Sequence, residues 1–310
     1  MTTATGAPAA SLQALLADAV DYAGLFPPAS LGLGDVVRLY TGYRRGPSSW
    51  ALGRLVVPAV RLPELADALA ARPLPLAVEA PVALSVILGS DLDGEVHQAE
   101  SMSKVSALCR VASLEAKAAD AAGVEAVART ARDAAERLGT PLYVELPLNG
   151  GLKTAVAAVR QARLRAKART GGVVPSAVPS AASVADFIAA CAGAGVAFKL
   201  TSGLHHAVRG RHPLTYERSA PSAVMHGFVN VFVAAALLVA GVSPATATQV
   251  LEESDGAAFR FGEEAIEWHA ERVDLKAIHE SRELLVSFGS CSFEEPMTAL
   301  AAWSAGAASL

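Results

Sequence analysis

The stretch best suited to chemistry is residues 196–206, which reads V-A-F-K-L-T-S-G-L-H-H. Apolar and polar side chains alternate up to Thr201, so a strand is predicted that carries Lys199 and Thr201 on one face. A glycine ends this strand, and His205 and His206 follow in a loop. A lysine on the inner face of a sheet beside a histidine loop indicates a reacting amine, although a lysine paired with a structural carboxylate would give the same pattern.

The use of lysine elsewhere in the chain strengthens the first interpretation. The sequence contains 20 arginines and only six lysines, so arginine is its general surface cation. A lysine kept in such a background is one that arginine could not replace, because ammonium and guanidinium differ in size, pKa and nucleophilicity.

Composition limits the class of protein and its partners. The chain has 310 residues, 52% hydrophobic content and a net charge of −4, which favours a globular protein and argues against binding to nucleic acid or to an anionic membrane. Its three cysteines are scattered and its N-terminus lacks a basic, then apolar, leader, so a cytoplasmic location is expected. The apolar run 228–242 is too short to cross a bilayer and is predicted to be a buried helix.

A strand–helix rhythm predicts the fold. Residues 9–22 are predicted to be a helix, and the proline-containing segment 21–30 is expected to pack across one end of the main domain. Eight strands are then predicted at 54–60, 82–88, 111–117, 142–147, 163–170, 196–201, 257–262 and 284–289, with alanine-rich helices between most of them. This repetition favours an α/β fold of the (β/α)8 TIM-barrel type over a doubly wound sheet, because no G-x-G-x-x-G motif follows an early strand.

The predicted domain organisation has one barrel with two additions. Residues 1–50 are expected to form a helical extension packed on the barrel, which itself spans 51–310. A long insertion after the sixth predicted strand, at 203–255, is expected to supply a lid loop and helices over the active-site face. The loop at 203–222 carries three histidines, three arginines and one glutamate, a composition suited to a small anionic substrate. The sequence leaves open whether the chain forms a homo-oligomer.

Alternate residues of each barrel strand point to the axis, and those near the strand ends line the site. The polar positions of the predicted strands are therefore expected in one pocket, where charges must be paired and are costly without a use. Candidates for catalysis are Lys199, Glu145, Lys167, Glu115, His205 and His206. Candidates for substrate binding, through cations, a hydroxyl or backbone N–H groups, are Lys117, Arg169, Thr170, Gly171, Gly172, Thr201, Arg260, Gly289 and Ser290.

The segment K-L-T-S-G at 199–203 resembles the K-T-S-T-G lysine motif of deoxyribose-phosphate aldolase, a Schiff-base (class I) aldolase with a barrel fold. The similarity covers about five residues and departs from the motif at Leu200. It implies that Lys199, on the sixth predicted strand, forms a carbinolamine and then an imine, and that Lys167 lowers its pKa. No cofactor is then expected.

Three functions are weighed. The first is an aldolase-like lyase that acts on a small anionic carbonyl compound through a Lys199 imine, with Glu145, Glu115 and a lid histidine moving protons. Here the cations Lys167 and Arg169 are expected to lower the pKa of Lys199. The second is a Mg²⁺- or Mn²⁺-dependent isomerase or lyase that uses Glu115, Glu145 and a lid histidine. The third is a barrel that binds an anionic ligand without catalysis.

Overall fold

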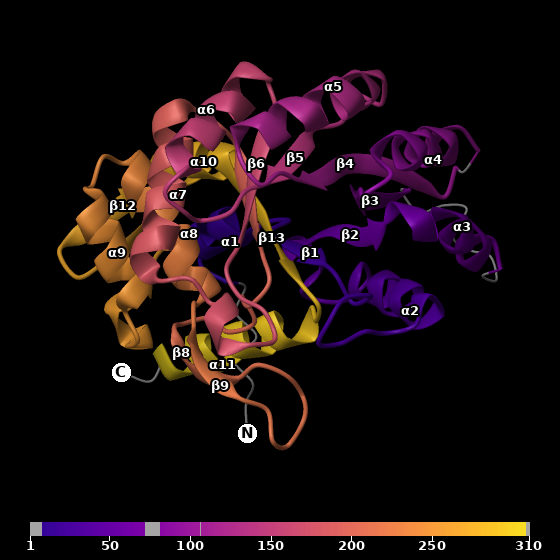
Figure 1. Cartoon of the computed structure of the whole chain (residues 1–310). Coiled ribbons are helices and arrows are strands. Elements are labelled where there is room, and N and C mark those ends of the chain that lie inside the picture. The colour runs from indigo at the N-terminus through magenta and orange to yellow at the C-terminus, as the bar shows by residue number, and fades with distance from the viewer. Residues whose placement is uncertain (1–7, 72–80, 106, 308–310) are drawn as a thin grey trace.

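The chain folds as a closed barrel of parallel strands. A computed structural model describes residues 8–71, 81–105 and 107–307. Within these residues eight parallel strands close into one barrel surrounded by helices, which confirms the predicted (β/α)8 class (Figure 1). In barrel order the strands are β1 (Val20–Tyr22), β2 (Leu52–Pro58), β3 (Val82–Ile87), β4 (Cys109–Lys117), β5 (Leu142–Glu145), β6 (Arg165–Arg169), β7 (Phe198–Thr201) and β13 (Leu285–Ser290).

The helices form the outer layer and bury the apolar faces of the strands. Phe198 of β7 packs edge-to-face on Phe187 with ring centroids 5.4 Å apart, and Phe288 of β13 stacks on Phe228 at the same separation. The predicted division of each strand into an apolar outer and a polar inner face is therefore confirmed for these strands. The helices are α1 (Ala10–Leu16), α2 (Leu33–Tyr43), α3 (Leu62–Ala70), α4 (Leu92–Val105), α5 (Ala121–Arg137), α6 (Leu152–Gln161), α7 (Ala181–Ala194), α8 (Phe228–Val239), α9 (Pro244–Glu252), α10 (Leu275–Leu284) and α11 (Glu294–Ala307).

Two apolar helices belong to this outer layer. The segment 175–194, which includes α7, is long and apolar enough to span a membrane by composition, but α7 packs against α6, α8 and α9. Residues 228–237 of α8 are all buried, which confirms the predicted buried helix.

The barrel differs from the prediction at two strands: one was not predicted, and one predicted strand lies elsewhere. The first is β1, which lies in the segment expected to be a helix: α1 ends at Leu16, Asp18 adopts a left-handed backbone with φ 51°, and β1 follows. β1 is only three residues long, so it shows no alternation that could reveal it. Residues 1–50 thus supply a barrel strand as well as helices, and Lys199 lies on the seventh strand of the barrel while Lys167 lies on the sixth.

The predicted strand at 257–262 is not part of the barrel. Residues Phe259–Phe261 form β10, the edge of a three-stranded antiparallel sheet with β11 (Ala265–Trp268) and β12 (Glu271–Asp274). The alternation of Phe259, Arg260 and Phe261 is that of a strand with one solvated face, and such a strand needs no place in the barrel.

The insertion after β7 begins with a hairpin rather than with a loop alone. β8 (Gly210–Pro213) and β9 (Ser222–Met225) pair antiparallel, and α8 then starts at Phe228, where the predicted apolar run 228–242 begins. The second predicted helix of the insertion is present as α9.

The ends of β6 and β7 approach each other closely through two glycines. A Cβ atom on Gly203 would lie 2.9 Å from the Cα atom of Gly171, and Gly203 has φ +83°, a conformation that disfavours any side chain. Thr170 closes the same junction by donating a hydrogen bond of 2.6 Å to the carbonyl oxygen of Ser202. The two glycines therefore determine how closely the ends of β6 and β7, which carry Arg169 and Thr201, approach each other.

We expect Gly203→Ala to destabilise the protein by about 1–3 kcal/mol, because it adds backbone strain and a steric clash at one position. Gly193→Ala, in the last turn of α7, should be neutral or stabilising by up to about 1 kcal/mol, because a Cβ added there would meet no atom within 4 Å. Urea unfolding at pH 7 measures both. Equal stabilities for the two variants would contradict the close approach of β6 and β7.

Candidate active site

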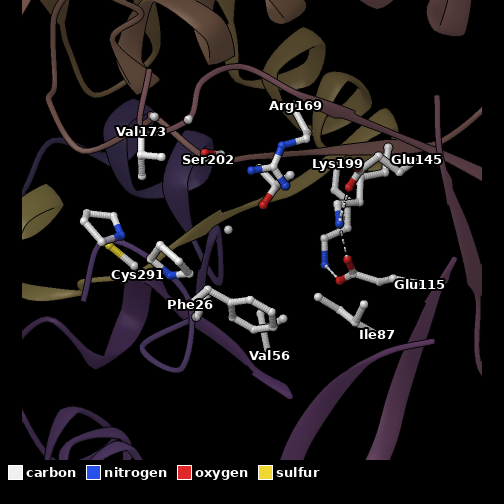
Figure 2. A pocket seen from close by; sticks show the side chains of 18 of the residues that line it. Phe26, Val56, Ile87, Glu115, Glu145, Arg169, Val173, Lys199, Ser202 and Cys291 are labelled. Atoms are coloured by element: carbon white, nitrogen blue, oxygen red, sulfur yellow. Dashed lines mark hydrogen bonds and ion pairs between the residues drawn. The ribbon is translucent and has the colours of Figure 1, made fainter. Parts of the chain in front are cut away.

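A pocket of about 330 Å³ opens at the carboxyl ends of the barrel strands. Its polar side holds carboxylates and lysines from β4, β5, β6 and β7, and its apolar side includes Phe26, Val56 and Ile87 (Figure 2). Leu214 and Met225 of the β8–β9 hairpin also line it, so the insertion after β7 does reach the pocket. Residues 23–28, expected to pack across one end of the domain, contribute Ala23, Phe26, Pro27 and Pro28 to its wall.

The carboxylate of Glu115 lies between two lysines at the base of this pocket. Its Oε1 atom accepts a hydrogen bond of 2.6 Å from Lys199 Nζ, and its Oε2 atom lies 2.7 Å from Lys167 Nζ. All three side chains are at most 5% exposed. Lys167 and Lys199 are direct register partners on β6 and β7, so one strand spacing separates their backbones. The structure thus brings together the three central residues that the sequence pattern selected.

Lys199 is held on its other side by Asp21, which is fully buried. Lys199 Nζ donates to Asp21 Oδ2 at 2.7 Å and to Ser85 Oγ at 3.2 Å. Asp21 is fixed in turn, because its Oδ1 accepts from the backbone N–H of Arg54 at 2.8 Å and its Oδ2 accepts from Ser287 Oγ at 2.8 Å. The ammonium of Lys199 therefore has three acceptors, one for each of its protons.

These pairs determine the charges of Glu115 and Lys199. Burial alone would raise the pKa of Glu115, but the ammonium groups of Lys167 and Lys199 outweigh it and hold that pKa well below its usual range. Burial alone would lower the pKa of Lys199, but Asp21 and Glu115 outweigh it and raise that pKa above its usual range. The expectation that neighbouring cations lower the pKa of Lys199 is therefore wrong: its nearest charged groups are carboxylates.

Glu145 lies on the pocket side of Lys167. Its Oε2 atom is 2.8 Å from Lys167 Nζ, and its Oε1 atom is 3.7 Å from Lys117 Nζ, a side chain that is 70% exposed at the rim. The contact from Lys167 Nζ to Glu145 Oε2 is an ion pair without hydrogen-bond geometry, and this buried oxygen has no other donor among the described residues. An acceptor of this kind beside an amine is suited to receive a proton.

The other predicted binding residues fall into three groups. Four of them line the pocket: Arg169, Gly172, Thr201 and Gly289. Thr170 and Gly171 instead hold the ends of β6 and β7 together, and Ser290 Oγ donates a local 2.6 Å bond to the carbonyl oxygen of Ser292 and lies 3.4 Å from His205 Nδ1. Arg260 is misassigned, because it lies on β10 outside the barrel, where it pairs with Glu267 at 3.0 Å on an exposed face.

The two lid histidines have different surroundings. His205 lines the pocket, and its Nδ1 atom is 2.8 Å from Glu295 Oε2. His206 instead stacks on His212 with ring centroids 3.4 Å apart, and burial together with the neighbouring His212 lowers its pKa to about 4. Of the pair, only His205 lies where it can act on a ligand in the pocket.

Sequence reasoning missed Asp21 and Ser85, which complete the environment of Lys199. Asp21 sits in V-D-Y-A-G-L-F, and a single carboxylate in so apolar a run is a usable signal. Ser85 gives no such signal, because a serine in an apolar strand is common. Cys291 also lines the pocket. Its position just after the last predicted strand is only a faint signal of this in the sequence.

The acids of this site do not form a metal centre with the histidines. No group of three or more His, Cys, Asp or Glu side chains in the described part of the chain is arranged to hold a metal ion. Both oxygens of Glu115 face lysine ammonium groups, which occupy the positions that a cation would need.

We expect Glu115→Gln to lower the free energy of unfolding by about 3–5 kcal/mol at pH 7, because two buried ammonium groups then face a neutral amide. The depressed pKa of Glu115 makes its contribution complete above the ordinary glutamate pKa of about 4.3 and progressively smaller as the pH falls further. The raised pKa of Lys199 makes its contribution complete below the ordinary lysine pKa of about 10.4, with loss only as the pH rises beyond that.

Urea unfolding between pH 3 and pH 7 measures the free energy of unfolding of the wild type and of Glu115→Gln. The variant should lose less stability than the wild type on acidification. Glu136→Gln, which removes a 66% exposed carboxylate on α5, is the control and should leave the midpoint nearly unchanged. A Glu115→Gln variant as stable as this control would contradict the network.

Comparison with known proteins adds no relative: no protein-family model and no curated protein matches this chain. Any function assigned to it therefore rests on its TIM-barrel fold, which is common among enzymes, and on the geometry of its own residues.

Proposed function

We propose that this protein is a Schiff-base-forming lyase of the aldolase type, which acts on small anionic carbonyl compounds through an imine on Lys167. The observation that carries the proposal is the buried set Lys167, Lys199, Glu115 and Glu145 at the base of one pocket. A set of paired charges there is costly as mere packing, and amine chemistry gives it a use.

The amine in this proposal is Lys167 rather than Lys199, which the sequence pattern favoured. All three protons of the Lys199 ammonium have acceptors, and its raised pKa keeps it charged at neutral pH. Within the described part of the chain, Lys167 Nζ has close contacts to two carboxylates, and the contact to Glu145 Oε2 lacks hydrogen-bond geometry. Lys167 also lies on the sixth barrel strand, the strand on which the aldolase resemblance expects the reacting lysine.

The residues would then act in sequence. Glu145 takes a proton from Lys167, whose nitrogen attacks the substrate carbonyl to form a carbinolamine. Glu145 returns that proton to the oxygen to give the carbinolamine, then carries a second proton from the nitrogen to the same oxygen, which leaves as water and gives the protonated imine. The imine accepts the electron pair when the adjacent carbon bond breaks. Throughout these steps Lys199 remains a fixed positive charge that keeps Glu115 ionised.

The rim of the pocket indicates an anionic substrate. Arg169 is exposed, lines the pocket and forms no ion pair within the described part of the chain. Lys117 lines the same pocket and is mostly exposed, with a 3.7 Å contact to Glu145. A carboxylate or phosphate on the substrate could be held by these two cations while its carbonyl reaches Lys167. A volume of about 330 Å³ suits a molecule of a few carbons.

Borohydride trapping tests the proposal. The protein is incubated with glyoxylate, a two-carbon anionic aldehyde, or with uncharged glycolaldehyde, and then reduced so that any imine becomes a stable amine. We expect a label on Lys167, formed more readily with glyoxylate. Lys167→Arg keeps a positive charge but cannot form the imine, so labelling should fall by at least about tenfold. Peptide mass spectrometry locates the label.

Two variants complete the experiment. Lys153→Arg, on the exposed face of α6, is the matched control and should label like the wild type. Lys199→Arg should retain the label on Lys167. A label on Lys199 in the wild type would refute the choice of lysine, whereas no label on either lysine would refute the imine mechanism and leave ligand binding without catalysis.

A further inference from the structure

A second group of reactive side chains lies in the same pocket and has no part in the lysine chemistry. His205 Nε2 is 4.0 Å from Cys291 Sγ, and on the other side of the ring His205 Nδ1 is 2.8 Å from Glu295 Oε2. The three residues come from separate elements: the loop after β7, the residue that follows β13, and the first turn of α11. Figure 2 shows Cys291 across the pocket from Lys199, Glu115 and Glu145.

We propose that Cys291 is a second nucleophile of this pocket, with His205 as its proton partner and Glu295 as the residue that positions His205, and that it adds reversibly to small aldehydes. A thiol, an imidazole and a carboxylate in this order form the arrangement that activates nucleophiles on many unrelated folds. Both Cys291 and His205 line the pocket, so a ligand bound there can reach the sulfur.

The surroundings of His205 support this role. Its titratable neighbours are Cys291, Glu295 and the adjacent His206, and Tyr216 reaches Cys291 Sγ at 3.8 Å from the hairpin loop. Burial would lower the pKa of His205, but its hydrogen bonds with Cys291 and Glu295 raise it to about 9. The ring therefore carries a proton at neutral pH, next to the sulfur.

The proposed step needs no further reactant. The sulfur of Cys291 forms a bond to the aldehyde carbon as the C=O π bond breaks. The carbonyl oxygen takes the electron pair and receives the Nε2 proton of His205, and the ring regains a proton from the Cys291 thiol. The product is a hemithioacetal, and the reverse steps release the aldehyde.

Alkylation by iodoacetamide, followed for each cysteine by peptide mass spectrometry between pH 6 and pH 9.5, tests the thiol. All three cysteines are buried, but Cys109 and Cys191 lie outside the pocket, so they serve as internal controls. We expect Cys291 to react at least about tenfold faster than either at pH 7. Glu295→Gln should slow Cys291 and shift its pH profile upward. Glu294→Gln, whose carboxylate accepts from Tyr43 instead, should leave both unchanged.

Glycolaldehyde, without borohydride, tests the addition to aldehydes. It should slow alkylation of Cys291 in the wild type and equally in Lys167→Arg, and dilution should restore the rate. Protection in Lys167→Arg separates this proposal from the imine mechanism. Equal reactivity of all three cysteines, an unchanged profile in both Glu295→Gln and His205→Gln, or absence of protection in Lys167→Arg would each overturn it.

Discussion

The carboxylate of Glu115 between the ammonium groups of Lys167 and Lys199 is the interaction on which the rest of the site depends. A buried carboxylate with no cation would take up a proton, and two buried ammonium groups with no anion would lose theirs. Glu115 stays ionised because neighbouring strands of a closed barrel hold Lys167 Nζ and Lys199 Nζ 2.7 and 2.6 Å from its two oxygens. The barrel thus keeps three charges in a volume from which water is largely excluded.

The same requirement explains the place of the shortest barrel strand. β1 has three residues, yet it carries Asp21, the second anion for Lys199, and it closes the barrel between β2 and β13. Asp21 is itself fixed by the backbone N–H of Arg54 on β2 and by Ser287 on β13, the two strands that flank it. Closure of the barrel and the charged state of Lys199 therefore depend on the same few contacts.

The sequence predicted the class of fold and the central charged residues, because both follow from periodicity: eight βα units, and polar side chains on alternate positions of strands. Periodicity failed where it had too few residues or the wrong context. β1 is too short to alternate, and β10 alternates without belonging to the barrel. The sign of the pKa shift at Lys199 could not be predicted either, because it depends on whether Asp21 or Lys167 lies closer to the ammonium, and Asp21 is 178 residues away in the chain.

The structure also separates charges that are already paired from those that remain available. At the base of the pocket Lys199 and Glu115 satisfy each other and Asp21, so a ligand there would gain little from them by direct contact. Glu145 and Arg169 are different: Glu145 Oε2 pairs with Lys167 without hydrogen-bond geometry and has no other donor, and Arg169 is exposed without an ion-pair partner, both among the described residues. A ligand that donates a hydrogen bond to Glu145 and places an anionic group against Arg169 would satisfy both side chains. A small anionic carbonyl compound carries both groups once its carbonyl is hydrated or converted to a carbinolamine.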